Sequence, residues 1–497
     1  MLAAFGQVVR LRMFSLFLAV IFLFVVTRYI LPTTYGTFTL VLSMIQVLTA
    51  LGLSWANKAI LRYGREEYVQ HSKLGETLAV RFVFQIGSLC VLVPLVLLGA
   101  DYAAAHVGSD PFILACIVIA GLVLLPLNEA GMMIAQTIQN FRAYGMVPVI
   151  QRSLQLAVAV GLAAGWLHGW TALAAGTLAG YFLGAAYTFF SVIKGNVGRL
   201  TIRTDVFKKM FTYSWSLPVI TVGALLVAWM DIWFIRYFID SEAVGIYAWS
   251  YTVTTLATSL IIPLAAVLGP RFVDYRLDNN SHRIREAFDV FRSVVLLAAA
   301  LLPIIIGFLF MVANTVNLGP YAPALAPLLI LTVATVLQLA MALMEVVIYA
   351  HERLVPVMAG VLLLIVTVNA GGNMVLIPWL GIEGAALSTL FGYAAGVLVQ
   401  WRVGMAKLNG SSRSVPFAVI AIAAAAVLFS MAAPFYHPLL VMGLGVGSST
   451  LMVGLMRRFG NLGGFDLINV SGRADLYLRW LANVPGKQLA ADGGESK

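Results

Sequence analysis

Charged side chains are scarce in this sequence. Only 10% of its 497 residues are Asp, Glu, Lys or Arg, whereas a soluble chain has about 25%. Hydrophobic residues make up 61%, against about 45–50% in soluble proteins. A chain of this composition has too few polar side chains to cover a surface that faces water. The composition therefore excludes a soluble enzyme or binding protein and indicates a protein that lies in a lipid bilayer.

Cysteine and histidine are also rare. The two cysteines, Cys90 and Cys116, fall inside apolar runs and lack the spacing of a metal or redox motif. The six histidines are scattered singly along the chain, whereas a metal site needs its ligands clustered. We therefore expect no metal site, no cofactor and no catalytic residue.

Apolar runs of helical length recur along the whole chain. A membrane-spanning helix needs about 20 residues, and fourteen runs approach or exceed this length. They lie at about 13–31, 36–60, 79–99, 111–134, 147–167, 170–192, 214–238, 244–268, 290–313, 325–350, 356–378, 383–401, 415–433 and 438–456. The first run follows two arginines but leads into the second without a cleavage site, so we expect a retained helix. The pattern predicts an all-α, multi-pass membrane protein with about fourteen transmembrane helices.

The loops between these runs alternate in charge. Every second loop is basic, with Arg62, Arg65, Lys73, Arg142, Lys194, Arg199, Arg203, Lys208, Lys209, Arg271, Arg276, Arg283, Arg285, Arg353, Arg402, Lys407 and Arg413. The opposite loops contain acidic residues and, outside the helix ends, no Lys or Arg. Basic loops stay in the cytoplasm, so both termini are predicted to be cytoplasmic. The net charge of +10 belongs to this pattern and does not indicate a nucleic-acid partner.

The chain repeats itself at an offset of 208 to 212 residues. The matching pairs are Arg28 and Arg236, Gly36 and Gly245, Arg62 and Arg271, Pro148 and Pro356, and Thr177 and Thr389. The repeat unit holds six predicted helices, an even number, so both copies should have the same orientation in the membrane. We expect two pseudo-symmetric lobes, 1–200 and 201–408, around a central substrate cavity. Two additional helices, 409–456, and a cytoplasmic tail, 457–497, would follow.

Short motifs at the helix ends resemble a known family. They are Arg28–Gly36, Leu51–Leu53, Gln139–Gly145 and Leu380–Ala386. Over roughly residues 10 to 400 the chain is similar to the MOP flippase superfamily, and most to its polysaccharide transporters, the Wzx-type flippases. The motifs are loose and identify the superfamily better than the substrate.

The resemblance implies a transporter rather than an enzyme. Such a flippase moves a polyprenyl-diphosphate-linked oligosaccharide from the inner to the outer leaflet of the bacterial cytoplasmic membrane by alternating access. The units then serve exopolysaccharide, capsule or O-antigen synthesis. The expected partners are this substrate, the membrane lipids, and the polysaccharide polymerase with its export machinery; the expected state is a monomer.

Basic and amide side chains in the spans are candidates for substrate binding. Arg28 and Arg236 occupy matching places in the first and seventh runs. Facing one cavity, two guanidinium groups would suit a diphosphate, but each side chain could instead extend to the headgroups. Lys58 could meet an incoming diphosphate or extend to the inner interface. Asn57, with Gln338, Asn369 and Asn373, could hold sugar hydroxyls or join helices.

Three acidic residues in the spans are candidates for ion coupling. A charge near the bilayer centre costs about 2.5–3.5 kcal/mol on insertion scales, so each needs a physical reason. Asp231 has no counterpart in the repeat and could carry a proton or a sodium ion, or pair with an arginine of a neighbouring helix. Glu129 and Glu345 lie in the cytoplasmic half and either line the cavity or hydrogen-bond between helices.

Two other functions compete with a polysaccharide flippase. A cation-coupled drug exporter, or an exporter of another lipid, from the same superfamily would share the fold. Such drug exporters have acidic cavities and twelve helices, which the two arginines and the last two helices argue against. A membrane-embedded polymerase or glycosyltransferase would need a sizeable segment outside the membrane. The longest predicted outer loop has about 11 residues, Ala100 to Asp110.

Overall fold

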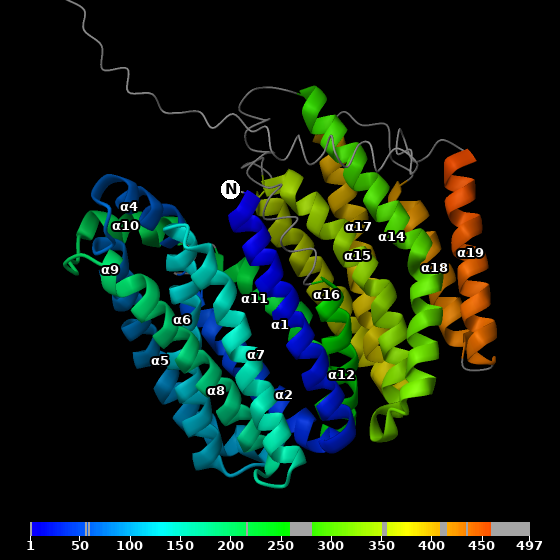
Figure 1. Ribbon diagram of the computed structural model, residues 1–497, viewed down its shortest axis with the longest axis horizontal. Helices are drawn as coiled ribbons and strands as arrows, with labels where there is room; N and C mark the ends of the chain where they lie inside the picture. The colour runs from blue at the N-terminus through cyan, green and yellow to red at the C-terminus, as the bar shows by residue number, and fades with distance from the viewer. Residues whose placement is uncertain are drawn as a thin grey trace, which may run out of the picture.

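The computed structural model describes residues 2–54, 57, 60–214, 217–258, 281–349, 355–407, 415–433 and 436–458 (Figure 1). Over these residues the chain is helical and forms no β-strand. Eleven of the described helices are long and apolar enough to cross a membrane. The predicted all-α, multi-pass class is therefore confirmed, while the total of fourteen spans and the side of the termini stay predictions.

The helices follow one another with short connections. The first half contains α1 (Leu2–Tyr29), α2 (Pro32–Thr49), α4 (Arg65–His71), α5 (Glu76–Val107), α6 (Pro111–Thr137), α7 (Phe141–Ala163), α8 (Gly169–Thr188), α9 (Lys194–Asn196) and α10 (Thr204–Ser214). The second half contains α11 (Leu217–Phe238), α12 (Ser241–Thr258), α14 (Ser281–Val316), α15 (Leu325–Tyr349), α16 (Val355–Leu380), α17 (Ile382–Lys407), α18 (Val415–Ala432) and α19 (Pro438–Arg458). Short π-helical segments, η1 (Ala50–Ser54), η2 (Ile60–Gly64) and η3 (Phe189–Ile193), and a 3-10 segment, η4 (Gly319–Ala324), complete these ranges.

One predicted loop is a helix. Residues 100–110 were expected to form an outer loop, but α5 continues to Val107 and the connection to α6 spans only Gly108–Asp110. This stretch holds four alanines, the residue with the highest helix propensity. Hydropathy measures the fit to lipid and not the tendency to form a helix. Because Asp101 and His106 are polar, a hydropathy criterion ends the predicted helix before the last two turns of α5.

The same neighbour relations occur in both halves of the chain. In the first half α1 packs against α7, α7 against α8, α8 against α6, and α6 against α5. In the second half α11 packs against α16, α16 against α17, α17 against α15, and α15 against α14. Figure 1 shows α5, α6, α7 and α8 on the left and α14, α15 and α17 on the right, with α1 and α11 overlapping between them. With α2, which packs against α6 and α8, added to the first set, and α12, which packs against α15 and α11, added to the second, we call these sets the first and second lobes.

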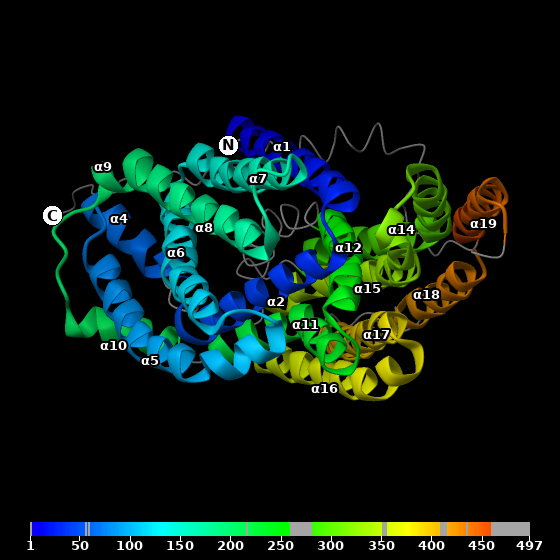
Figure 2. The same cartoon turned by 90° about the horizontal axis from the view of Figure 1, so that it is seen from below.

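The last two helices lie on the outer flank of the second lobe (Figure 2). α19 packs against α14, and α18 packs against α14 and α15. None of these contacts reaches the first lobe, so α18 and α19 extend one lobe within the part of the chain that is described.

The segment between the lobes is held on the first lobe. Leu74 donates its N–H to Asn196 O at 2.8 Å, and Gly198 donates to Leu74 O at 2.9 Å. Beyond this segment, α10 places Phe207 against Phe84 of α5, with ring centroids 4.9 Å apart. The connection therefore stays with the first lobe as far as the end of α10.

A carboxylate caps the start of α5. Glu67 of α4 accepts backbone N–H groups from Gly75 at 2.6 Å, Glu76 at 2.8 Å and Thr77 at 3.0 Å. Burial would raise the pKa of Glu67, but these hydrogen bonds to the charged form outweigh it and hold the pKa below its usual value. Free N–H groups at a helix start favour a negative charge.

This cap predicts a pH-dependent contribution to stability. The pKa of Glu67 is lower in the folded protein than in the unfolded chain. The contribution of the ionised carboxylate to folding stability is therefore complete above the unfolded pKa of about 4.3. It is lost as the pH falls through the folded value. We expect Glu67→Gln to lower stability by about 1 kcal/mol at pH 7, and the difference from wild type to shrink towards pH 3. Thermal unfolding in detergent across this range measures it, and a difference independent of pH would contradict it.

Candidate functional site

The two lobes meet where α2 lies beside α12. This contact, which we call the seam, is closest at Gly36 and Gly245. A Cβ atom on Gly36 would lie 2.0 Å from Ser241 O, and one on Gly245 would lie 1.9 Å from Pro32 O. Both pairs, Gly36 with Gly245 and Pro32 with Ser241, are related by the repeat offset of 209 residues. The seam is therefore the same contact made twice, as expected at a pseudo-two-fold axis.

Hydrogen bonds between side chains and across helix ends join the lobes along the seam. Three of the donors are tryptophan N–H groups, which need a partner when they are buried. The bonds are Tyr35 Oη with Thr252 Oγ1 at 3.1 Å, Trp249 Nε1 to Thr27 Oγ1 at 2.8 Å, Tyr321 Oη to Ile30 O at 3.2 Å, Trp233 Nε1 to Ser43 Oγ at 3.0 Å, and Trp229 Nε1 to Gln46 Oε1 at 3.2 Å.

The Gly36–Gly245 contact of the seam lies at one end of the molecule. We call this the turn end, because the α1–α2 and α11–α12 turns lie there. Figure 1 shows the two lobes together at the turn end and diverging towards the end that holds the N-terminus. The glycine contact thus lies at one side of the predicted membrane, and further contacts between the lobes continue along α2 to η1, which packs against α11.

The repeat-related arginines have different surroundings. Arg28, in the last turn of α1, is exposed and has no hydrogen-bond or ion-pair partner among the described residues. Arg236, in the last turn of α11, donates Nε–H to His106 O at 2.7 Å. That carbonyl belongs to the last turn of α5, where helix dipoles favour a cation. Arg236 therefore links α11 of the second lobe to α5 of the first, and no described contact joins it to Arg28.

Asp231 lies in a polar network inside the second lobe. It is 1% exposed and accepts hydrogen bonds from Tyr247 Oη at 2.5 Å, Thr389 Oγ1 at 2.5 Å and Asn373 Nδ2 at 2.8 Å. Asn369 donates Nδ2–H to Thr389 Oγ1 at 3.1 Å and accepts from Asn373 Nδ2 at 2.6 Å. The network thus ties α11, α12, α16 and α17 together, and Asn369 and Asn373, predicted from sequence as polar positions, both join helices here.

The partners of Asp231 in this network are neutral. The buried oxygen Asn373 Oδ1 has no hydrogen-bond partner within the described chain. The carboxyl group of Asp231, two amide oxygens and two hydroxyls therefore gather in one buried cluster. Oxygen ligands of this kind suit a proton or a hard cation such as sodium. In the part of the chain that is described, no group of three or more His, Cys, Asp or Glu residues could hold a metal ion.

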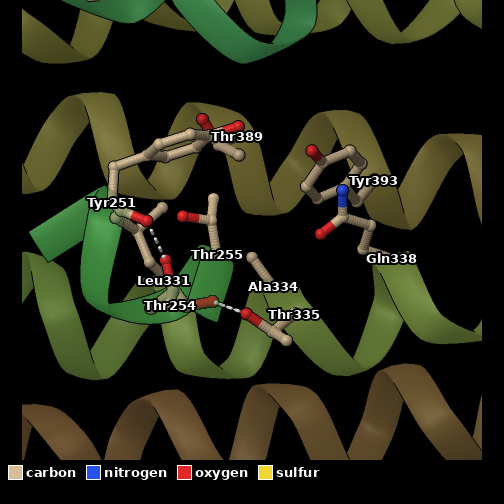
Figure 3. Close-up of a pocket in the computed structure, with 9 residues that line it drawn as sticks. All are labelled: Tyr251, Thr254, Thr255, Leu331, Ala334, Thr335, Gln338, Thr389 and Tyr393. Atoms are coloured by element: carbon tan, nitrogen blue, oxygen red, sulfur yellow. Dashed lines mark hydrogen bonds between the residues drawn. The ribbon is translucent and has the colours of Figure 1, made fainter. Parts of the chain in front are cut away.

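A small polar hollow adjoins this network (Figure 3). The space in it that can hold the centre of a water-sized molecule is about 10 Å³, and it lies between α12, α15 and α17. Tyr251, Gln338, Thr389 and Tyr393 contribute its polar groups. Because Thr389 both lines the hollow and donates to Asp231, the hollow and the buried carboxylate share a side chain.

A second polar cluster lies inside the first lobe. Asn57, 3% exposed, donates Nδ2–H to Glu129 Oε2 at 3.0 Å and accepts from Arg81 Nε at 3.1 Å. Arg81, 2% exposed, also donates to Pro126 O at 2.7 Å and to Gln85 Oε1. The structure therefore brings together Asn57 and Glu129, two residues predicted separately. The third residue of this region, Lys58, lies outside the described residues.

Sequence reasoning missed two arginines within the spans. Arg81 precedes Gln85 by four residues in α5, a spacing that places both on one helix face and that would have marked it. Arg152 lies near the middle of α7, is partly exposed, and donates Nη1–H to Gln155 Oε1 at 2.8 Å. Gln155 donates in turn to Thr177 Oγ1 at 3.2 Å. A mid-span arginine is costly in lipid, so Arg152 indicates a polar interior to the first lobe.

Glu345, the remaining predicted residue, stands apart from both clusters. It is partly exposed on α15 and lies beside Gln400 of α17. It therefore joins neither the Asp231 network nor the Asn57 cluster in any described hydrogen bond.

Solved structures of MOP-superfamily proteins share this fold. A lipid II flippase, MurJ, in an inward closed conformation aligns over 92% of this chain and 99% of its own, with 11% identity and a TM-score of 0.67. A multidrug resistance MATE transporter, inward-facing, aligns over 79% and 94%, with 12% identity and a TM-score of 0.62. A MOP superfamily transporter from Pyrococcus furiosus aligns over 82% and 95%, with 12% identity and a TM-score of 0.57. At these identities the likeness shows the fold alone.

A comparison with protein-family models identifies the family of this chain. The model of the polysaccharide biosynthesis protein family matches residues 25–319, more than half of the chain, from α1 into η4. No curated protein matches the chain. The chain therefore belongs to the polysaccharide biosynthesis protein family.

Proposed function

We propose that this protein flips a polyprenyl-diphosphate-linked oligosaccharide repeat unit from the inner to the outer leaflet of the bacterial cytoplasmic membrane. One observation carries the proposal: the polysaccharide biosynthesis match runs through the first lobe into the second, on a fold shared with a lipid II flippase. The units would serve exopolysaccharide, capsule or O-antigen synthesis, with a polymerase and export machinery as partners.

Rocking of the two lobes would supply alternating access. With the predicted cytoplasmic termini, the turn end faces outward, and the seam at Gly36 and Gly245 closes that side. The headgroup then enters from the inner leaflet, where the lobes diverge. Opening the seam while the opposite ends approach would expose it outside.

The proposed headgroup contacts are Arg28, Arg236, Lys58 and Asn57. An exposed guanidinium such as that of Arg28, which has no partner among the residues that the structure describes, can bind phosphate oxygens bidentately. Among the described residues Arg236 hydrogen-bonds only through Nε, so its two terminal nitrogens can donate to a phosphate. Outward movement of a negative headgroup also follows a potential that is negative inside, worth about 2.3 kcal/mol per charge per 100 mV.

Ion coupling is proposed at Asp231, with Glu129 and Glu345 as secondary candidates. The neutral partners and the unpartnered Asn373 Oδ1 around Asp231 support a bound proton or sodium ion. Such an ion would be an additional driving force, because the membrane potential alone already favours the outward step.

Reconstitution tests the proposed function. Proteoliposomes containing the wild type should translocate a polyprenyl-diphosphate-linked oligosaccharide, and a negative-inside potential should raise the rate. The double variant Arg28→Ala/Arg236→Ala should be slower by about ten- to a hundredfold, because hydrogen bonds to charged groups contribute about 1.5–3 kcal/mol. Lys208→Ala, which removes an exposed charge from α10, is the matched control.

The outcomes separate the parts of the proposal. A wild type that leaves the lipid-linked oligosaccharide on one side would contradict the substrate. Full activity in the double variant would contradict the arginine contacts and leave the substrate intact. A rate indifferent to membrane potential would contradict the electrical driving force.

A further inference from the structure

Arg152 lies at mid-depth in the first lobe, on the inner face of its helix. It occupies the middle of the 23-residue helix α7, about 16 Å from either end at a rise of 1.5 Å per residue. Ser153 and Val160, seven residues apart on one face of α7, are exposed. Arg152 and Ala159 share a different face, and Ala159 is 0% exposed. Because residues seven apart lie on the same side of a helix, Arg152 is directed into the lobe and not towards lipid.

The guanidinium of Arg152 is only partly engaged by the protein. It can donate through Nε and both terminal nitrogens, and the described chain accepts one bond, from Nη1 to Gln155 Oε1 at 2.8 Å. Gln155 donates in turn to Thr177, which donates to Leu173 O at 2.9 Å. This chain of hydrogen bonds holds one corner of the guanidinium in place. No described acidic side chain forms an ion pair with Arg152, so its charge is open to a negatively charged ligand.

Two tyrosines lie near this charge. Tyr35 of α2 and Tyr181 of α8 are the titratable side chains that interact electrostatically with Arg152. The hydroxyl of Tyr181 makes no hydrogen bond within the described chain. Glu129 also acts on Tyr181, but its negative charge is balanced by Arg81. A guanidinium and a phenol therefore come together as hydrogen-bond donors without a described acceptor.

The repeat relates this region to the network of the second lobe. At an offset of 212 residues, Thr177 corresponds to Thr389 and Tyr181 to Tyr393. In the second lobe Thr389 donates to Asp231, and the charge of Asp231 acts on Tyr393. In the first lobe the equivalent threonine and tyrosine accompany an arginine. The same pair of side chains thus stands beside a negative group in one lobe and a positive group in the other.

We propose that Arg152, with Tyr181, forms an oxyanion site in the first lobe, opposite in polarity to the Asp231 network. A planar guanidinium with unengaged nitrogens and a phenolic O–H match the several oxygens of a phosphate group. A free phosphate and the diphosphate of the transported lipid share this chemistry. The second source rests on the proposed function, and it places Arg152 halfway between the inner entrance and the arginines at the turn end.

Binding of inorganic pyrophosphate to the purified protein tests the site. The measurement uses calorimetric titration in detergent, with Arg28→Ala/Arg236→Ala as the background so that those two arginines contribute nothing. Adding Arg152→Gln should raise the Kd for pyrophosphate at least about tenfold, because it removes charged hydrogen bonds. Arg142→Gln is the matched control, since Arg142 lies on the same helix and is exposed. A Kd unchanged by Arg152→Gln, or raised equally by Arg142→Gln, would overturn the site.

A milder substitution tests the site without disturbing the fold. Tyr181→Phe removes only a hydroxyl that has no partner in the described chain, so the unfolding temperature should stay that of the background protein. The Kd for pyrophosphate should rise about threefold, since one hydrogen bond to a charged group is lost. An unchanged Kd in this variant would contradict the participation of Tyr181 and, if Arg152→Gln fails to fold, would overturn the site.

Flipping in proteoliposomes distinguishes the two sources of phosphate. If the site holds the lipid diphosphate, Arg152→Gln alone should slow flipping of the lipid-linked oligosaccharide about tenfold, and pyrophosphate should inhibit the wild type competitively. A normal rate in Arg152→Gln, with pyrophosphate binding lost, would assign the site to a free oxyanion and overturn the lipid source. Pyrophosphate binding through Arg152 in a protein that flips no oligosaccharide would contradict the proposed function and not the oxyanion site.

Discussion

Gly36→Ala is expected to lower the rate of translocation about ten- to a hundredfold. The added Cβ would lie 2.0 Å from Ser241 O, a backbone atom that cannot rotate away. Relief requires α2 and α12 to move apart, which removes the closed state of the seam. Overpacking of a close contact costs about 1–3 kcal/mol, and this cost falls on the closed state alone, since an open seam has room for a methyl group. The flipping rate in proteoliposomes measures the effect.

The repeat makes this prediction sharper. Gly245→Ala should have the same effect as Gly36→Ala, because its Cβ would lie 1.9 Å from Pro32 O in the equivalent contact. Gly371→Ala on α16 is the control, since a Cβ there meets nothing within 4 Å. Normal flipping by either seam variant would contradict the role of the seam.

Spectroscopy separates closure from folding. Spin labels at Tyr29 and Tyr237, two exposed repeat-related positions at the turn end, report the separation of the lobes. Cys90 and Cys116, which are exposed, would first be replaced by serine. We expect Gly36→Ala to shift the distance distribution to longer values. An unchanged distribution alongside lost activity would point to another step of the cycle.

Hydropathy located the helices because a bilayer demands long apolar runs with every backbone hydrogen bond made internally. The same criterion misplaced the end of α5, where polar Asp101 and His106 lie in a helix that no longer needs to match lipid. The repeat was visible because both copies keep arginine, glycine, proline and threonine at equivalent positions. That Gly36 and Gly245 touch each other could not be read from the sequence, since an offset relates positions without saying how the lobes pack.

The sequence identified candidate residues but did not predict which side chains they contact. Asp231 was found because a single charge in an apolar run is conspicuous, but its partners Tyr247, Thr389 and Asn373 come from three other helices. Equivalent positions also failed to give equivalent surroundings, because Arg236 meets the end of α5 while Arg28 has no such neighbour in the described chain. Sequence symmetry therefore predicted which residues correspond and not what they contact.

The largest expected effect in the second lobe is that of Asp231→Asn on ion-driven transport. The amide keeps the shape of the carboxylate, with its oxygen towards Asn373 Nδ2 and its NH₂ group towards the hydroxyls of Tyr247 and Thr389. Those hydroxyls can rotate to accept, so the variant should unfold within a few degrees of wild type. The negative charge that would bind a proton or sodium ion is lost, however. We expect the acceleration of transport by an ion gradient to fall at least about tenfold, since a charged hydrogen bond contributes about 1.5–3 kcal/mol.

A second substitution shows that charge, and not packing, is responsible. Asp231→Ala leaves three buried donors without their acceptor, at about 1–3 kcal/mol for each unsatisfied group, and should lower the unfolding temperature far more than Asp231→Asn. Glu242→Gln, an exposed acid at the start of α12, is the control for charge. Sodium chloride or acid should stabilise the wild type against heat relative to choline chloride at neutral pH, because a ligand that binds only the folded state raises its stability. The same response in Asp231→Asn would place the ion elsewhere and leave Asp231 with the role of tying four helices together.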